Sequence, residues 1–469
     1  MREAFLQFVW QQQLITPSAM TTTSGQPVVV MKAGNLNTYS GPDFANAQIW
    51  IDGMVWFGAV EIHYRSSDWQ AHTHHQDQAY EQVILHVVWH HDKEIYLADG
   101  TALPTLTLAG SVPQSVIDKY QGLLQVPAGL LPCQPYLQQL DRLTKINMLD
   151  HALWLRLHRK ALLVQDLLIS NQYDWETTIW QWLAQAFGFK ANSAPMLVLA
   201  QQVPLKIIRK HRNVPRHIEA LLLGFAGWLN ISKQEDEPDP ADQLYAQQLL
   251  QDWDWLRTKF NLTDKVMISS LWKTGGLRPG NHPVTRIVQL AALVTAVPSL
   301  FNLIGLQQDQ DDLSQMMDLD PDPHADFYQA DGSIKVQETM VTRLATQLTA
   351  SPSPYWNRHS GLGKPCKPHN PTMGQQSVDT ILVNTLAPLM VAYGQHQNQG
   401  QHTHQAMALL ESLPAESNAI TRFWAAHQLP LHTAFDTQAA IELKTQFCDQ
   451  KRCLSCRIGQ RIVGRDKVD

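Results

Sequence analysis

The segment Val83–Trp89, with the sequence VILHVVW, constrains the fold of this chain more than any other. Apolar residues, most of them β-branched, fill the segment apart from His86, which favours an extended strand. A strand that is apolar on both faces has to be covered on both faces. The sequence therefore predicts a central strand of an α/β domain, in which His86 is a core histidine with a hydrogen-bond partner.

The residues that precede this strand predict the rest of the domain. Phe5, Val9 and Trp10 have helical spacing, and Asp52-Gly53 is a hairpin turn signal between two expected strands. The predicted order is helix, strand, strand, strand, helix and then the central strand. The elements expected before the central strand are a helix over Arg2–Gln13, strands over Gln26–Lys32, Phe44–Ile51 and Met54–His63, and a polar helix over Ala71–Gln82.

From about residue 113 the pattern becomes mostly helical. Two segments rich in proline and acidic residues, 233–239 and 309–326, interrupt it and are expected to be exposed loops. A chain of 469 residues exceeds the about 250–300 at which a single core stops growing. We predict an α/β domain over residues 1–112, a mostly α-helical region over 113–440, and a basic tail with cysteines over 441–469.

Composition narrows the class of protein. A hydrophobic content of 44% argues against disorder, and no apolar stretch approaches the about 20 residues that span a bilayer. The N-terminus lacks the layout of a signal peptide, and the odd number of cysteines, 5, argues against a disulfide framework. We expect a cytoplasmic protein with no membrane partner.

Asp43, Glu61 and His63 form the most informative pattern in the chain. Asp43 opens one expected strand, while Glu61 and His63 lie two apart near the end of the next and so share a face. The hairpin brings these strand ends together. Two adjacent carboxylates repel unless a cation lies between them, and oxygen ligands suit Mg²⁺ or Mn²⁺. His63 could hold or deprotonate a water molecule beside that ion.

This pattern resembles the signature of the PD-(D/E)XK nuclease superfamily, which has Pro-Asp on its second strand and Asp/Glu-x-Lys on its third. Pro42-Asp43 and Glu61-Ile62 match the signature, and His63 stands where the superfamily has lysine. The resemblance covers about residues 1–92 and implies a restriction-endonuclease-like core. It implies that both carboxylates and the Ile62 carbonyl hold the metal, and that Glu3 on the first helix joins the site.

A group of histidines follows these residues closely. His72 and His75 share one face of the expected helix, and His74 lies on another. Histidines this dense could extend the metal site or contact phosphate, or they could line a solvated helix face. If His63, His72 and His74 converge, a histidine-ligated zinc hydrolase becomes the competing chemistry.

Two basic segments of the helical region are candidates for nucleic-acid contact. The stretch 206–216 is rich in lysine and arginine, and the Gly/Pro-rich loop 272–286 leads into a helix whose N-terminus would favour an anion. A solvated helix end and a plain loop-to-helix junction are the alternatives. The candidate residues are Lys206, Arg209, Lys210, Arg212, Arg278 and Arg286.

Cys448, Cys453 and Cys456 lie close together in the tail. The last two form a CxxC pair, which can chelate one ion. Cys133, Cys366 or a histidine could be the fourth ligand, and zinc or an iron–sulfur cluster would fit. Several nuclease families that resemble the N-terminal core carry a cysteine-ligated cluster after it. Three unligated thiols are the alternative.

The chain as a whole is similar to one uncharacterised bacterial family, on segments such as Gly41–Phe44 (GPDF), Leu277–Arg286 (LRPGNHPVTR) and Cys453–Gly459 (CLSCRIG). Our leading hypothesis is a metal-dependent nuclease or phosphodiesterase acting on nucleic acid. The alternatives are an inactive, nuclease-like binding or assembly module and a histidine-ligated zinc hydrolase. Residues 1–112 hold 4 Lys and Arg against 10 Asp and Glu, so this domain is suited to cations, and the basic helical segments would have to contact nucleic acid.

Overall fold

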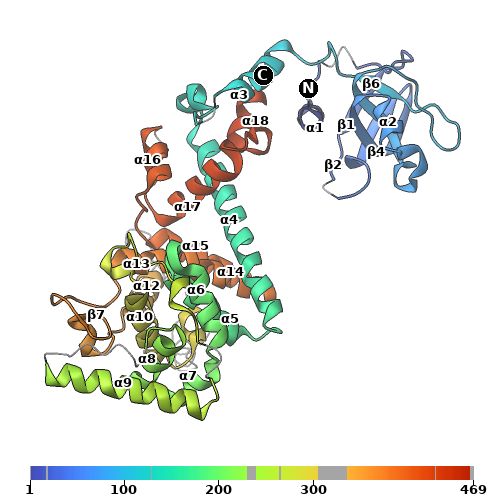
Figure 1. The fold of residues 1–469 in the computed structure, drawn as a ribbon. Coiled ribbons are helices and arrows are strands. Elements are labelled where there is room, and N and C mark those ends of the chain that lie inside the picture. Colours follow the sequence, from blue (N-terminus) through green and yellow to red (C-terminus); the bar gives the residue numbers. More distant parts are fainter. Residues whose placement is uncertain are drawn as a thin grey trace, which may run out of the picture. The chain divides into compact units, whose positions relative to one another are not determined.

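The computed structural model describes residues 2–16, 20–37, 39–127, 129–229, 239–262, 266–304, 335–427 and 429–464. The described chain divides into two units (Figure 1). The sheet unit comprises residues 1–152, 419–429 and 440–469, and the helical unit comprises 153–418 and 430–439. The expected tail therefore belongs with the sheet, and so do residues 113–152. Of the two expected acidic loops, residues 233–238 and the whole of 309–326 lie outside the described residues.

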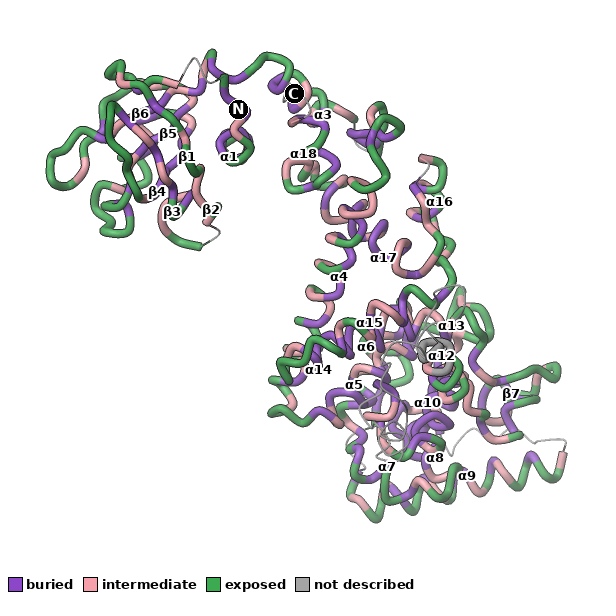
Figure 2. Tube along the Cα trace, turned by 180° about the vertical axis from the view of Figure 1, so that it is seen from behind, coloured by how far each residue is buried: buried purple, intermediate pink, exposed green. Residues whose placement is uncertain are grey.

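A mixed sheet forms the centre of the N-terminal part, as the sequence predicts. Its order is β1-β3-β4-β5-β6, with β2 paired to β3. The pairs β1–β3 and β3–β4 are antiparallel, whereas β4–β5 and β5–β6 are parallel. The strand β5 is mostly buried (Figure 2), as expected for VILHVVW. The strands are β1 Val28–Lys32, β2 Asn35–Leu36, β3 Phe44–Ile51, β4 Met54–Arg65, β5 Val83–His90 and β6 Thr105–Thr107.

The hairpin between β3 and β4 forms at the predicted turn. Ile51 pairs with Met54, and Asp52 and Gly53 both have positive φ, 45° and 88°, which a two-residue hairpin turn of this hand requires. The helix α1 (Glu3–Gln11) buries Phe5, Val9 and Trp10 and packs against β4. Five of the six elements predicted for this domain, the first helix and four strands, therefore exist close to their expected bounds.

The single helix expected over Ala71–Gln82 is wrong. The chain instead forms the short helix α2 (Asp68–Ala71) and two 3₁₀ turns, η2 (His74–Gln76) and η3 (Gln78–Tyr80). Thr73 adopts a left-handed conformation, with φ of 61°, which ends α2. His72 and His75 consequently do not share the face of one helix.

The rest of the sheet unit is helical and joins distant parts of the sequence. Helix α18 packs against α3, and Nζ of Lys451 donates to the carbonyls of Leu124 and Val126 at 2.7 and 2.9 Å. The elements are α3 Gln114–Gln125, η4 Gln134–Gln139, the start of α4 Arg142–Ser170, α16 Ala419–Ala426, the π-helix η12 Leu443–Cys448, η13 Cys453–Ser455 and α18 Arg457–Gly464. Helix α17, Ala434–Glu442, begins in the helical unit and ends in the sheet unit.

The helical unit packs its helices in adjacent pairs. Helix α5 lies along α6, α8 contacts both α9 and α10, and α14 contacts α15. Gly224 lets α8 and α9 approach, because a Cβ there would lie 2.2 Å from the Trp253 ring. The helices are α5 Trp175–Phe187, α6 Phe189–Gln202, α7 Leu205–His211, α8 Pro215–Phe225, α9 Pro240–Lys259, α10 Pro283–Ala296, α12 Lys335–Leu348, α13 Gln375–Ile381, α14 Ala387–His396 and α15 Gln401–Ser412.

A buried glutamate holds several segments of the helical unit together. Glu219 on α8 is 2% exposed. Its carboxylate accepts from the backbone N–H and hydroxyl of Ser353 at 3.1 and 2.8 Å, from Nε1 of Trp356 at 2.8 Å and from the hydroxyl of Tyr245. The charge is therefore fully hydrogen-bonded, and its removal would leave several buried donors without an acceptor.

We expect Glu219→Ala to lower the free energy of unfolding by about 3 kcal/mol, because buried donors lose their acceptor and a cavity forms. Glu219→Gln keeps the volume and one carbonyl oxygen, so it should cost less. The measurement is urea unfolding of the full chain. Equal midpoints for Glu219→Ala and the wild type would contradict this role.

Candidate metal centre

The register of the β3–β4 hairpin places Asp43 beside Glu61. Phe44 pairs with Val60, so the residue before β3 lies opposite the residue after Val60. The backbone N–H of Asp43 donates to Oε2 of Glu61 at 3.0 Å. In return, Oδ2 of Asp43 accepts from the backbone N–H of Ile62 at 3.1 Å. Asp43 and Glu61 are therefore neighbours across the hairpin, as the sequence predicts.

Helix α1 contributes to the same place. Nε2 of Gln7 donates to Oδ1 of Asp43 at 2.9 Å. Glu3 lies one turn earlier on α1 and is exposed, and its negative charge is close enough to raise the pKa of both carboxyl groups. Gln7 was missed by sequence reasoning, although its position four residues after Glu3 could have indicated it.

Glu61 links the carboxyl pair to the histidines. Its Oε1 lies 3.4 Å from Nε2 of His63 and 3.4 Å from Nε2 of His74. Glu61 and His63 are 5% and 2% exposed. Nε2 of His74 is buried and makes no hydrogen bond within the described residues. Two imidazoles therefore face one oxygen of a buried carboxyl group.

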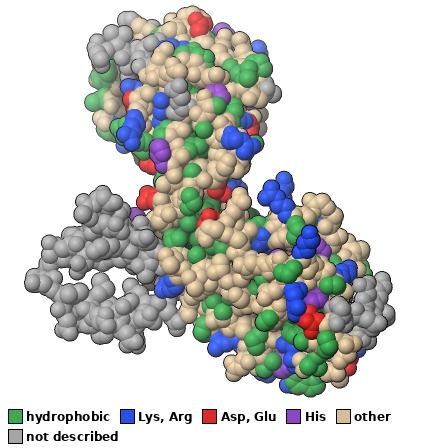
Figure 3. Space-filling model, turned by 90° about the vertical axis from the view of Figure 1, so that its left-hand side faces the viewer, with side chains coloured by type: hydrophobic (Ala, Val, Ile, Leu, Met, Phe, Trp, Pro, Cys, Tyr) green, Lys and Arg blue, Asp and Glu red, His purple; other side chains and the backbone are tan. Residues whose placement is uncertain are grey.

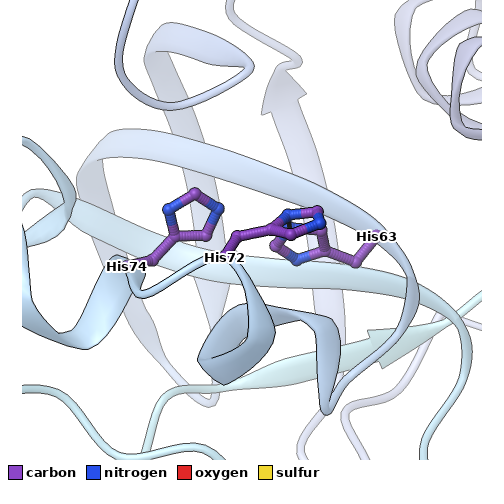
Figure 4. Close-up of side chains that lie close together, drawn as sticks. All are labelled: His63, His72 and His74. Carbon is purple, nitrogen blue, oxygen red and sulfur yellow. Dashed lines mark hydrogen bonds between the residues drawn. The ribbon is translucent and has the colours of Figure 1, made fainter.

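His63, His72 and His74 converge, as Figure 4 shows. One ring nitrogen from each lies within 4.8 Å of the other two, and within the described part of the chain this is the single such set of His, Cys, Asp or Glu. Nε2 of His63 is 3.1 Å from Nδ1 of His72. The strand β4 carries His63, and the turn after α2 carries the other two. The interruption of the helix at Thr73 therefore brings these three histidines together.

Residues behind this set fix the orientation of its rings. Nδ1 of His63 lies 2.9 Å from Nε2 of His86, which is fully buried on β5, so the core histidine has the expected hydrogen-bond partner. If Nδ1–H of His63 donates to His86, Nε2 of His63 is left with a free lone pair. The ring of Tyr80 stacks on His74, with centroids 3.8 Å apart. Sequence reasoning did not identify Tyr80.

Burial determines the charge of these groups. It raises the pKa of Glu61 to about 8, with a further contribution from the charge of Asp43. Burial also raises the pKa of Asp43 to about 6, against the lowering effect of its hydrogen bonds from Ile62 and Gln7. Burial and the neighbouring histidines lower the pKa of His63 to about 2. Near pH 7 the centre therefore combines a neutral imidazole with a protonated Glu61, and a bound cation would favour ionisation of Glu61.

The basic residues proposed for nucleic-acid contact lie in the helical unit. Arg209 forms an ion pair with Glu176, and Lys206, Lys210 and Arg278 are exposed, with Arg212 half-buried. On the face drawn in Figure 3, lysine and arginine side chains are scattered among uncharged ones.

Arg286 does not fit a phosphate-contacting role. It is 5% exposed, and its guanidinium donates to Gln289, Asn281 and Ser377 at 2.5–2.9 Å. It also lies over the ring of Phe189, 4.1 Å from the centroid. Because the side chain is enclosed by protein, we assign Arg286 to the packing of α10.

A match to a protein family covers most of the chain. A family model described as a protein of unknown function (DUF2851) matches residues 3–419. The chain belongs to this family. The DUF2851 match includes every residue of the candidate metal centre and Cys133, whereas Cys448, Cys453 and Cys456 lie beyond its end. Neither the curated proteins nor the solved structures give a match. No helix within the described residues of this DUF2851 member is long and apolar enough to cross a membrane.

Proposed function

We propose that the chain is a metal-dependent phosphodiesterase that cleaves nucleic acid. One observation carries the proposal: buried Glu61 lies between Asp43 on one side and two imidazoles of a converging histidine set on the other. Buried carboxyl and imidazole groups with strongly shifted pKa values are typical of catalytic centres.

The contacts favour a metal-ligand set other than the carboxylates of Asp43 and Glu61 alone. Both oxygens of Asp43 already accept amide N–H groups, whereas Oε1 of Glu61 faces the imidazoles of His63 and His74. We therefore propose Glu61, His63, His72 and His74 as ligands. Asp43 would position Glu61, because its backbone N–H donates to Glu61 and its carboxylate accepts from the backbone N–H of Ile62, the next residue. Mixed imidazole and carboxylate donors favour Mn²⁺ or Zn²⁺ over Mg²⁺.

The ion would activate a water molecule and stabilise charge on the phosphate. The chain's own groups would do the rest. Ionised Glu61 would hold the ion, and neutral His63 would be kept in place by His86. The substrate class is supported by the resemblance of Pro42-Asp43, directly before β3, and Glu61-Ile62, on β4, to the signature of PD-(D/E)XK nucleases. The exposed basic residues Lys206, Lys210 and Arg278 would contact phosphates.

The test is cleavage of single- and double-stranded DNA and RNA by the purified full chain with Mn²⁺, Zn²⁺ or Mg²⁺. We expect cleavage with Mn²⁺ or Zn²⁺ and none after chelation. If the wild type and Asp43→Ala behave alike on all four substrates, the proposal is wrong. Metal binding without cleavage of any substrate would instead favour the binding or assembly module.

His74 and His75 offer a matched pair of variants. His74 faces Glu61, whereas His75 is exposed and contacts Gln76. We expect His74→Ala to weaken Mn²⁺ binding by at least about tenfold, because a ligand is lost, and His75→Ala to leave it unchanged. Calorimetric titration gives both affinities. Equal affinities for the two variants would exclude His74 as a ligand.

A second candidate is a histidine-ligated zinc hydrolase acting on a small molecule. The convergence of His63, His72 and His74 favours it, because three histidines are a known ligand set for catalytic zinc. Zinc in the purified protein, with hydrolysis of small esters or amides but no cleavage of nucleic acid, would support this candidate over the first.

A further inference from the structure

Four of the five cysteines come together in the sheet unit, at a cavity that none of the three histidines lines. Cys133, Cys448, Cys453 and Cys456 line one small cavity, together with Leu123 and Phe447. Cys133 lies 315 positions before Cys448 in the sequence, so only the fold brings it to the other three. All four are free thiols, and the fifth cysteine, Cys366, belongs to the helical unit.

The local backbone allows the segments that carry these cysteines to approach one another. The π-helix η12 ends at Cys448, and such wide turns are frequent at functional sites. Gly459 allows the first turn of α18 to approach Cys453, since a Cβ there would lie 2.1 Å from the Cys453 carbonyl oxygen. Lys451, with a left-handed φ of 52°, ties this loop to the end of α3.

The surroundings suit thiolates bound to a positively charged group. The backbone N–H groups of Ile458 and Gly459 donate to the sulfur of Cys456, and such hydrogen bonds are common at ligating sulfurs. Arg452 lines the cavity.

The sequence spacing favours a cluster over a single ion. Cys448, Cys453 and Cys456 have the spacing C-x4-C-x2-C, and the fourth cysteine of the cavity is distant in the sequence. Plant-type iron–sulfur proteins hold their cluster with cysteines at the spacing C-x4-C-x2-C and a distant fourth cysteine. Structural zinc sites more often use two close pairs of ligands.

We propose that Cys133, Cys448, Cys453 and Cys456 hold an iron–sulfur cluster that joins residues 440–464 to the segment following the sheet. Cys133 is thereby the fourth ligand, and Cys366 is excluded. The cluster is separate from the Glu61 centre and does not depend on the proposed phosphodiesterase activity.

The test is iron, acid-labile sulfide and zinc analysis of the full chain purified without oxygen, together with its visible absorption. We expect equal amounts of iron and sulfide in the wild type and in Cys366→Ser, and a loss of iron on the order of tenfold or more in Cys133→Ser and Cys453→Ser. Zinc without sulfide, no metal, or full iron retention in Cys133→Ser would overturn the proposal.

Thiol alkylation followed by mass spectrometry tests the proposal on the wild type alone. It therefore remains informative if a cysteine variant fails to fold. In the loaded protein, only Cys366 should react rapidly. Cys448 and Cys453 are partly exposed, as Cys366 is, so their protection would come from ligation. After iron removal all 5 cysteines should react. Rapid alkylation of Cys453 before iron removal would contradict cluster ligation.

Discussion

Glu61→Gln is expected to reduce metal-dependent cleavage by about 10²- to 10⁴-fold. The substitution keeps the size of the side chain and can still accept the Asp43 N–H. It removes the negative charge that would hold the ion next to His63 and His74. Because Glu61 is 5% exposed, water cannot readily replace the lost ligand. The measurement is kcat/KM on the best substrate at saturating Mn²⁺.

Glu81→Gln is the matched control, because Glu81 is exposed and lies in the same unit. We expect its activity to equal that of the wild type. The thermal midpoint of metal-free Glu61→Gln should not fall, since a neutral side chain at this buried position removes no charge pair. Wild-type activity in Glu61→Gln would exclude Glu61 from the reaction.

The backbone around the site could be predicted wherever the local sequence preference agrees with the tertiary fold. VILHVVW can be satisfied only as a covered strand, and Asp52-Gly53 supplies the two positive φ angles of the hairpin. Once the hairpin is fixed, its register brings Asp43 and Glu61 together. Periodicity of two then places His63 beside Glu61.

The histidine set was harder to predict, because its geometry depends on one non-helical residue. Polar composition alone favours a helix over Ala71–Gln82, but the left-handed Thr73 redirects the chain so that His74 turns back toward Glu61. Threonine has no strong preference for that conformation, so the sequence carries no local signal for it. The packing of Tyr80 against His74 supplies the compensating contact.

Long-range pairings were the least predictable part. Gln7 reaches Asp43 only because α1 packs on β4, and Cys133 meets the tail only because α18 packs on α3. The sequence spacing identified Cys453 and Cys456 as a pair but left the fourth ligand open. Charge was more informative, because the acidic excess of residues 1–112 lies in the segment that carries Glu61, the buried carboxyl group of the candidate centre.

Mn²⁺ affinity is expected to rise steeply between pH 6 and pH 8. Burial first, and then the charge of Asp43, raise the pKa of Glu61 from its ordinary value of 4.5 to about 8. Below that pH the ion has to displace a proton from Glu61, so Kd should increase about tenfold for each pH unit down to 6. His63 adds nothing in this range, because its pKa of about 2 keeps it neutral.

The raised pKa of Glu61 also determines whether the metal-free protein becomes more or less stable as the pH rises. Between pH 4.5 and about 8 the folded state retains the Glu61 proton, whereas the unfolded state has lost it. The contribution of this proton to the stability of the folded state is therefore fully present below pH 4.5 and is lost as the pH rises through 8. Added Mn²⁺ should offset the loss at pH 8 more than at pH 6. Glu61→Gln, which cannot ionise, should remove both dependences. Calorimetric titrations at pH 6, 7 and 8 measure the proton release directly, and a wild-type Kd that is the same within about twofold at pH 6 and pH 8 would contradict a protonated Glu61 ligand.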